Sequence, residues 1–277
     1  MSIVDIFNFD EKKIGFSAPI NSTSQEGGVS YQKIYLNYQN EKFHFELPMV
    51  EMTITKNTKK KYEAYSAKFK LNIAKQEYIS KIIECFQKIY GASTKHIEDT
   101  KSKLNFKNKA KFKADKAEEC GFNNPLYYIT DKESGEKTNQ PPMIYANLVI
   151  KSKNNTTIKY PSGINQFKTL DYLQYLGVRM HCIPVLNISN IFVGNDGDIR
   201  LQLQLAGATV IKVIESADFD QSSSFSKYGI DISNTIDSFN ELSNAPKRQE
   251  RKDRNVSIEF EGDDELDLNE VLRNTDD

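Results

Sequence analysis

The chain has 277 residues, 38% of them hydrophobic, and its 37 basic and 38 acidic residues leave a formal net charge of -1. This length allows one large domain or two smaller ones, and 16 Phe and 14 Tyr are enough for a folded core. Three scattered cysteines argue against a disulfide framework, and no signal-peptide pattern or membrane-length apolar run is present, so we expect an intracellular protein without membrane contact.

The first regular pattern begins at Val29, and we expect residues 1–28 to form an irregular N-terminal segment. Apolar and polar residues alternate from there to Tyr38, and a turn at Asn40 leads into a second run, which predicts a β-hairpin. Pro48 interrupts the second run, so we expect an edge or bulged strand that resumes after it.

A third strand and a helix follow. Residues 65–73 alternate and place Lys68 and Lys70 on one face, opposite an apolar face. Between 79 and 90 the apolar residues recur at helical spacing, and Gly91 is interpreted as the C-terminal stop of this amphipathic helix. The predicted order up to this point is three strands and then one helix.

The next stretch, 101–116, is strongly basic: it holds seven lysines, and Asp115 is its only acid. As a helix it would scatter its lysines around the axis, whereas an extended segment gathers them on one face. We therefore predict an extended segment with its apolar face at Phe106, Ala110, Phe112 and Ala114 and its basic face at Lys107, Lys109, Lys111 and Lys113. A solvated surface usually mixes both signs of charge, so this run favours contact with a polyanion.

The remaining elements are predicted as strands at 126–130 and 143–151 separated by a loop, a short helix or packed loop at 164–177, and a hairpin of 178–193 with 199–214. In the second strand of that hairpin the expected inward residues are Ile199, Leu201, Leu203 and Leu205. Beyond residue 215 the sequence turns polar, with one short helix expected near 230–242. Residues 259–277 hold nine acidic residues and a single arginine, Arg273.

The sequence contains no recognisable catalytic constellation. His44, His96 and His181 show no metal-ligand spacing, and Cys182 points to the opposite strand face from its neighbour His181. No Walker, GxGxxG or GxSxG motif is present, and Cys85 is most simply a core residue. We therefore predict that the protein is not an enzyme and holds no metal or cofactor.

The sequence does provide the parts of a single-strand binding site, in which a cationic groove follows the backbone and bases stack on aromatic rings, at about 1–3 kcal/mol per base. The predicted backbone contacts are Lys59, Lys60, Lys61, Lys68, Lys70, Lys107, Lys109, Lys111 and Lys113, with Arg200 as a further cation. The predicted stacking residues are Tyr35, Tyr62 and Phe112. We expect Lys68, Lys70 and the lysines of 107–113 to line one groove.

Other interpretations of these features stay open. Each phenylalanine is also explained by core packing, because a half-buried strand alternates apolar and charged residues in the same way. The acidic tail keeps the protein soluble, occupies the basic groove when DNA is absent, or docks on a partner through its apolar residues, and the last two roles are compatible. The basic run at 247–254 is either an import-like signal or a linker that contacts phosphates.

Three stretches resemble a known family: YLNY at 35–38 with FHFELPM at 43–49, KFKLNIAKQEYISKIIECFQKIYG at 68–91, and HCIPVLNISNIFVGNDGDIRLQLQLAGATVIKV at 181–213. With the acidic end, they are similar to the single-stranded DNA-binding proteins of nucleocytoplasmic large DNA viruses, in the asfarvirus and giant-virus branch, with the poxvirus replication phosphoprotein as a distant relative. The resemblance spans about residues 29–214 and the tail, and the lysine-rich insertion departs from it. It implies an OB-fold that coats single-stranded DNA during viral replication, repair and recombination.

We therefore predict a mainly β protein with one or two helices, built on an OB-fold-like Greek-key β-barrel. Its expected parts are an irregular segment at 1–28, a binding domain at 29–214 with a lysine-rich insertion at about 95–125, a polar linker at 215–254 and a disordered acidic C-terminal tail at 255–277. The expected function is binding of single-stranded DNA without sequence preference in viral DNA replication, recombination and repair, at a cytoplasmic virus factory, in the nucleus or in the virion. Expected partners are single-stranded DNA and, through the tail, replication proteins; a homo-oligomer is compatible with this role. The alternatives are a viral structural or scaffold protein and a single-stranded RNA-binding protein.

Overall fold

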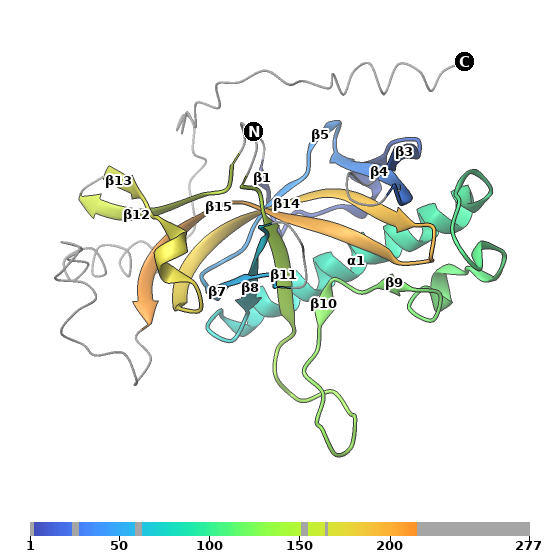
Figure 1. The fold of residues 1–277 in the computed structure, drawn as a ribbon. Helices are drawn as coiled ribbons and strands as arrows, with labels where there is room; N and C mark the ends of the chain where they lie inside the picture. Colours follow the sequence, from blue (N-terminus) through green and yellow to red (C-terminus); the bar gives the residue numbers. More distant parts are fainter. Residues whose placement is uncertain (1–2, 24–27, 59–62, 151–154, 164–165, 215–277) are drawn as a thin grey trace.

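The computed structural model describes residues 3–23, 28–58, 63–150, 155–163 and 166–214, arranged as Figure 1 shows. These residues form a mainly β protein with one α-helix, α1. The strands that form its central barrel are β7 (Val50–Lys56), β8 (Tyr65–Lys70), β11 (Met143–Leu148), β14 (Arg179–Gly194) and β15 (Ile199–Ile214). None of the described helices is long and apolar enough to span a membrane. The predicted linker and acidic tail lie outside the described residues.

The barrel closes because its five strands pair in a ring. β7 pairs antiparallel with β8, β8 antiparallel with β11, β11 parallel with β15, β15 antiparallel with β14, and β14 antiparallel with β7. The spatial order β14, β7, β8, β11 is that of a Greek key, in which the fourth strand returns to lie beside the first. The mainly β, OB-fold-like barrel expected from the sequence is confirmed.

The barrel interior is filled by every second residue of its strands. Met52 of β7, Phe69 of β8 and Ile144 of β11 are partners in register, and all three are fully buried. Because successive side chains of a strand point to opposite faces, the residues between them point outward. This alternation places Lys68 and Lys70 on the outer surface of β8, as the sequence predicts.

The long hairpin of β14 and β15 joins the barrel to a wider sheet and matches the predicted hairpin closely. The predicted inward residues of β15 are all buried. Along its other edge β14 pairs with β7, then β6 and then β4. The strands outside the ring are β1 (Ile3–Val4), β2 (Ile14–Phe16), β3 (Ile20–Thr23), β4 (Ser30–Tyr38), β5 (Glu41–Lys42), β6 (His44–Glu46), β9 (Phe122–Asn123), β10 (Leu126–Tyr127), β12 (Thr157–Gly163) and β13 (Gln166–Thr169).

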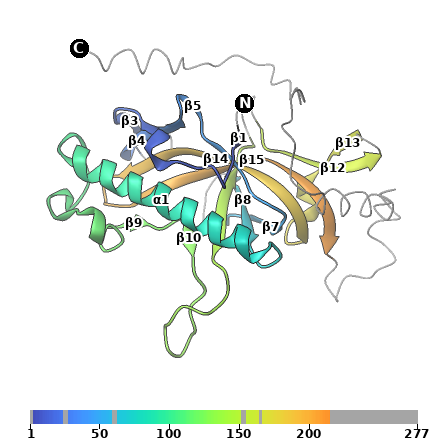
Figure 2. The same cartoon turned by 180° about the vertical axis from the view of Figure 1, so that it is seen from behind.

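The helix α1 (Gln76–Thr100) follows the three predicted strands and is longer than predicted. Gly91 does not end it, because the buried face continues through Ser93, Thr94 and Ile97. Only β7 and β8 of the ring precede α1, since the first predicted strand is β4, which pairs with β14 outside the ring. The predicted order of three strands followed by a helix is therefore found, but the first of these strands lies outside the barrel. Figure 2, the view from behind, shows α1 running across the side of the molecule that faces away from the reader in Figure 1.

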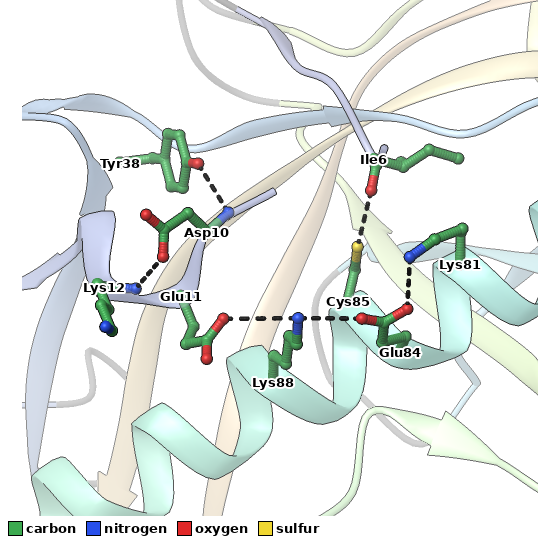
Figure 3. Close-up of polar contacts among 9 residues, drawn as sticks. All are labelled: Ile6, Asp10, Glu11, Lys12, Tyr38, Lys81, Glu84, Cys85 and Lys88. Atoms are coloured by element: carbon green, nitrogen blue, oxygen red, sulfur yellow. Dashed lines mark hydrogen bonds and ion pairs between the residues drawn. The ribbon is translucent and has the colours of Figure 1, made fainter. Parts of the chain in front are cut away.

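The N-terminal segment is not irregular throughout, since β3 pairs with β4 and β1 pairs with β6. Polar contacts also tie this segment to α1 (Figure 3). The Cys85 thiol donates a hydrogen bond to the Ile6 carbonyl at 3.4 Å, and the Lys88 ammonium lies 3.6 Å from the Glu11 carboxylate. Cys85 is buried, as predicted, and burial raises the pKa of its thiol to about 11, so it stays uncharged.

Short 3-10 turns complete the described structure: η1 (Glu11–Lys13), η2 (Lys101–Lys103), η3 (Lys109–Lys111), η4 (Ala114–Lys116) and η5 (Tyr172–Tyr175). Three of them occupy the lysine-rich stretch, so the extended segment predicted there is wrong. Asn108 has a left-handed backbone with φ of 64°, which breaks an extended run, and the Phe112 N–H donates to the Lys109 carbonyl at 3.2 Å. The turns allow Phe106 and Phe112 to meet in the core, with ring centroids 5.8 Å apart.

Candidate functional site

The residues predicted to contact nucleic acid fall into separate groups. Lys59, Lys60, Lys61 and Tyr62 lie outside the described residues. Lys68 and Lys70 lie on the outer surface of the barrel. The lysines of 107–113 lie near the turn between β14 and β15, and the last two predicted residues, Tyr35 and Arg200, lie on the sheet beyond the barrel.

Lys68 belongs to a row of outward side chains that crosses four strands. Its partners in register are Thr53 of β7 and Tyr145 of β11, and Thr53 is in turn the partner of Arg179 of β14. Neighbouring strands lie about 4.8 Å apart, so the row spans roughly 15 Å. Lys68 and Arg179 form no ion pair with another described residue, which leaves both charges available to an anion.

Two tyrosines extend this surface, and sequence reasoning missed both. The side chains of Tyr127 and Tyr145 are exposed by 49% and 38%, and their rings form an edge-to-face pair with centroids 4.9 Å apart. Burial, with a smaller contribution from Tyr127, raises the pKa of Tyr145, so its hydroxyl stays protonated and uncharged at neutral pH. We call the surface formed by Lys68, Lys70, Tyr127, Tyr145 and Arg179 the barrel face.

A signal for Tyr145 is present in the sequence. The flanking residues Ile144 and Ala146 are both buried in the barrel. Strict alternation along a strand therefore points Tyr145 outward, on the same side as Lys68 in the neighbouring strand. The pairing of the two strands, which local alternation does not encode, is what brings the ring beside the lysine.

One acidic side chain interrupts the positive charge of the barrel face. The Glu51 side chain is only 6% exposed, and its Oε1 lies 3.2 Å from Nζ of Lys70, whose charge it compensates. His181 is the partner of Glu51 across β14 and β7. Burial lowers the pKa of His181 below its ordinary value of 6.5, so the imidazole is neutral at pH 7. The barrel face therefore carries two uncompensated cations, Lys68 and Arg179, at neutral pH.

The lysine-rich segment lies far from the barrel face. β8 leads into the N-terminal end of α1, whereas this segment follows its C-terminal end, and a helix of 25 residues is roughly 37 Å long. The Lys107 N–H donates to the Asn195 carbonyl at 3.0 Å, in the turn that follows β14. Both views place the segment beyond the end of α1 and away from β8 (Figures 1 and 2). The prediction that Lys68, Lys70 and the lysines of 107–113 line one groove is wrong.

Phe112 is also misassigned as a stacking residue. Its ring is fully buried against Phe106 and therefore packs the core instead of meeting a base. Two lysines of the segment are used internally: the Lys101 ammonium donates to the Phe112 carbonyl at 3.0 Å, and the Lys109 ammonium donates to the Leu104 carbonyl at 2.8 Å. The other predicted contacts of the segment, Lys107, Lys111 and Lys113, are exposed, and none forms an ion pair with another described residue.

Tyr35 and Arg200 lie on the sheet formed by β4, β14 and β15. Tyr35 is half-buried and is the partner of Asn190 in β14. The Arg200 side chain is 52% exposed, and its guanidinium lies 3.2 Å from the Asp198 carboxylate. The predicted residues are thus divided between the barrel face, the lysine-rich segment and this outer sheet.

A metal centre finds no support in the part of the chain that the structure describes, where no group of three or more His, Cys, Asp or Glu residues could hold an ion. Cys182 is buried while His181 is partly exposed, so the two side chains point to opposite faces of β14, as predicted.

Comparisons with known proteins show no family for this chain. No protein-family model matches it, and no curated protein matches it either. The family resemblance of its sequence stays a prediction, and the function has to be argued from the geometry.

Proposed function

We propose that the chain binds single-stranded nucleic acid, and foremost single-stranded DNA, on the barrel face and without strong sequence preference. The observation that carries this proposal is the row in which Tyr145, Lys68 and Arg179 lie in register on β11, β8 and β14, with β7 between the last two and the exposed ring of Tyr127 beside the row. Exposed aromatic rings next to unpaired cations are the two components that a single-strand binding site combines.

The position of this surface in the barrel supports the proposal. β8 and β11 are the second and third strands of the ring in chain order. In OB-folds the face of the second and third strands is the one that binds oligonucleotides. The loop between the first two ring strands, which also borders that surface in OB-folds, contains the predicted contacts at 59–62, outside the described residues.

The chemistry of the barrel face accounts for the expected preference. Every base presents a face that can stack on tyrosine, so binding tolerates any sequence, whereas a duplex hides those faces. Each phosphate neutralised by Lys68 or Arg179 contributes about 0.7 to the log-log salt dependence for a single strand. Two such contacts predict that a tenfold rise in salt lowers the affinity by roughly 25-fold.

In this role the protein coats single-stranded DNA during viral DNA replication, recombination and repair. The acidic residues of 255–277, which lie outside the described residues, compete with nucleic acid for the cations or recruit replication proteins. Single-stranded RNA presents similar bases and the same phosphates. A direct comparison of the two nucleic acids therefore has to show whether the chain prefers DNA or RNA.

Titration of a labelled oligonucleotide, as single-stranded DNA, duplex DNA and RNA of one length at two salt concentrations, tests this function. The wild type should prefer the single strand, and Tyr145→Ala should weaken its binding by roughly 5- to 160-fold, which corresponds to the loss of one stacked base. Phe167→Ala is the matched control, because Phe167 is an aromatic residue exposed by 50% on β13, away from the barrel face. Equal affinity for duplex and single strand, or a Tyr145→Ala protein that binds like the control, contradicts the proposal.

A further inference from the structure

A second group of aromatic and cationic side chains lies on the sheet beyond the barrel. Phe192 of β14 is flanked in register by Lys33 of β4 and Arg200 of β15. The ring of Tyr31, on the same face of β4 as Lys33, lies 5.1 Å from the ring of Phe192. We call Tyr31, Lys33, Phe192 and Arg200 the hairpin platform.

The two cations lie against the two rings. The Arg200 guanidinium carbon is 4.9 Å from the centroid of Phe192, and Nζ of Lys33 is 5.5 Å from the centroid of Tyr31. At these distances the charge is attracted to the ring face, which keeps cation and ring together on the surface. Asp198 compensates part of the charge of Arg200, whereas Lys33 has no ion pair with another described residue.

The hairpin platform is not needed to fill the core. The residues that alternate with it, Ile34 of β4 and Ile191 and Val193 of β14, are fully buried on the opposite face of the same strands. The platform rings are only half-buried, and the Arg200 side chain remains 52% exposed. A half-exposed ring flanked by cations has the composition of a stacking site for a base with its phosphate.

We propose that the hairpin platform is a second subsite for the same single strand of nucleic acid, in which bases stack on Phe192 and Tyr31 and phosphates pair with Lys33 and Arg200. This inference rests on the proposed function, and it extends the proposed binding site from the barrel face to the hairpin platform. β7 of the barrel face pairs with the first residues of β14, whereas Phe192 lies near its end. The part of β14 between its first residues and Phe192 is roughly 40 Å long if it is straight. A single strand of roughly 12 stacked nucleotides would span this length. A short oligonucleotide therefore occupies one subsite at a time, and a longer one occupies both.

The chain contains no tryptophan, so a single introduced tryptophan reports on its own position. Tyr145→Trp reports on the barrel face, Phe192→Trp on the hairpin platform, and Phe167→Trp on a control site of similar exposure to Tyr145. Oligothymidylates of about 6 and about 20 nucleotides serve as probes, the first near the short end of the range of OB-fold site sizes and the second beyond its long end. The short probe, at the concentration that saturates the barrel face, should quench the fluorescence of the Tyr145→Trp protein and leave that of Phe192→Trp unchanged. The long probe should quench both and leave Phe167→Trp unchanged.

A charge variant gives a second measurement. Lys33→Ala with Arg200→Ala should weaken binding of the long probe by at least about fivefold, lower its log-log salt slope by up to about 1.4, and leave the short probe unaffected. Lys159→Ala with Lys168→Ala, on β12 and β13, removes the same charge elsewhere and should have little effect. A Phe192→Trp protein that stays silent with the long probe while Tyr145→Trp responds overturns the second subsite and leaves the proposed function standing. Silence of both reporters, with no binding by the wild type, overturns both.

Discussion

The negative charge of Glu51 weakens the attraction of the barrel face for a phosphate, so removing this charge should strengthen nucleic-acid binding. Its carboxylate is almost fully buried beneath the outward surface and lies 3.2 Å from the ammonium of Lys70. Glu51→Gln keeps the shape of the side chain, removes one negative charge and releases Lys70 for a phosphate. The expected result is tighter binding of single-stranded DNA with a steeper salt dependence.

The magnitude follows from the geometry. A unit charge about 8 Å from a phosphate contributes roughly 0.5–2 kcal/mol at an effective dielectric constant between about 80 and 20. Screening by salt reduces this value, so we expect a rise in affinity of about 2- to 10-fold. The released Lys70 adds about 0.7 to the log-log salt slope if it neutralises one phosphate. Because the Lys70 side chain is 35% exposed, its ammonium stays hydrated after the ion pair is lost, and Glu51→Gln also removes a charge from a nearly buried site, so the substituted protein should still fold.

Fluorescence anisotropy of a labelled oligothymidylate at several salt concentrations measures both the affinity and the slope. The matched control is Glu84→Gln, which makes the same change in net charge on α1, where Glu84 pairs with Lys81 and Lys88. The reasoning is refuted if Glu51→Gln binds no more tightly than Glu84→Gln, because the effect would then reflect net charge alone. Unfolding followed by circular dichroism establishes that both variants are folded.

Three further perturbations test other parts of the structure. Phe112→Ala removes a fully buried ring and should lower stability by about 3–5 kcal/mol while the folded protein keeps its affinity; a loss of affinity at unchanged Tm would assign the ring to binding instead. Gly91→Ala places a methyl group in open space within α1 and should raise stability by about 0.5–1 kcal/mol, whereas a lower Tm would contradict a helix that continues through this residue. Burial lowers the pKa of His181, and a bound phosphate favours its cationic form, so affinity should rise as the pH falls well below 6.5; matching pH profiles for the wild type and His181→Gln would exclude this role.

The local alternation of apolar and polar residues predicts much of the fold, because its two-residue period decides which side chains of a strand point into the core. It predicts the inward face of β15 and the outward position of Lys68 in β8, and both are found. The same rule applied to β11 points Tyr145 outward, although no neighbouring lysine in the sequence marks it as a binding residue. The buried face of α1 continues past Gly91 through two polar residues, Ser93 and Thr94, so neither the glycine nor the apolar spacing alone predicts where the helix ends.

Local patterns do not predict which distant segments pair. Arg179 lies near Lys68 only because β14 pairs with β7, and β7 with β8. The closed ring likewise depends on the parallel pairing of β11 with β15. In the lysine-rich segment, alternation of Lys and Phe fits a strand and equally fits turns that bring Phe106 and Phe112 into the core, so only the tertiary structure separates the two.

Ultraviolet crosslinking of the full chain to oligothymidylate, followed by mass spectrometry of its peptides, shows most directly where bases lie. Adducts on Tyr145 and Tyr127 are expected, since these are the exposed rings of the barrel face. Adducts confined to residues 101–116 or to α1, with the peptides of β10 and β11 unmodified, would mean that nucleic acid does not bind on the second and third strands of the barrel.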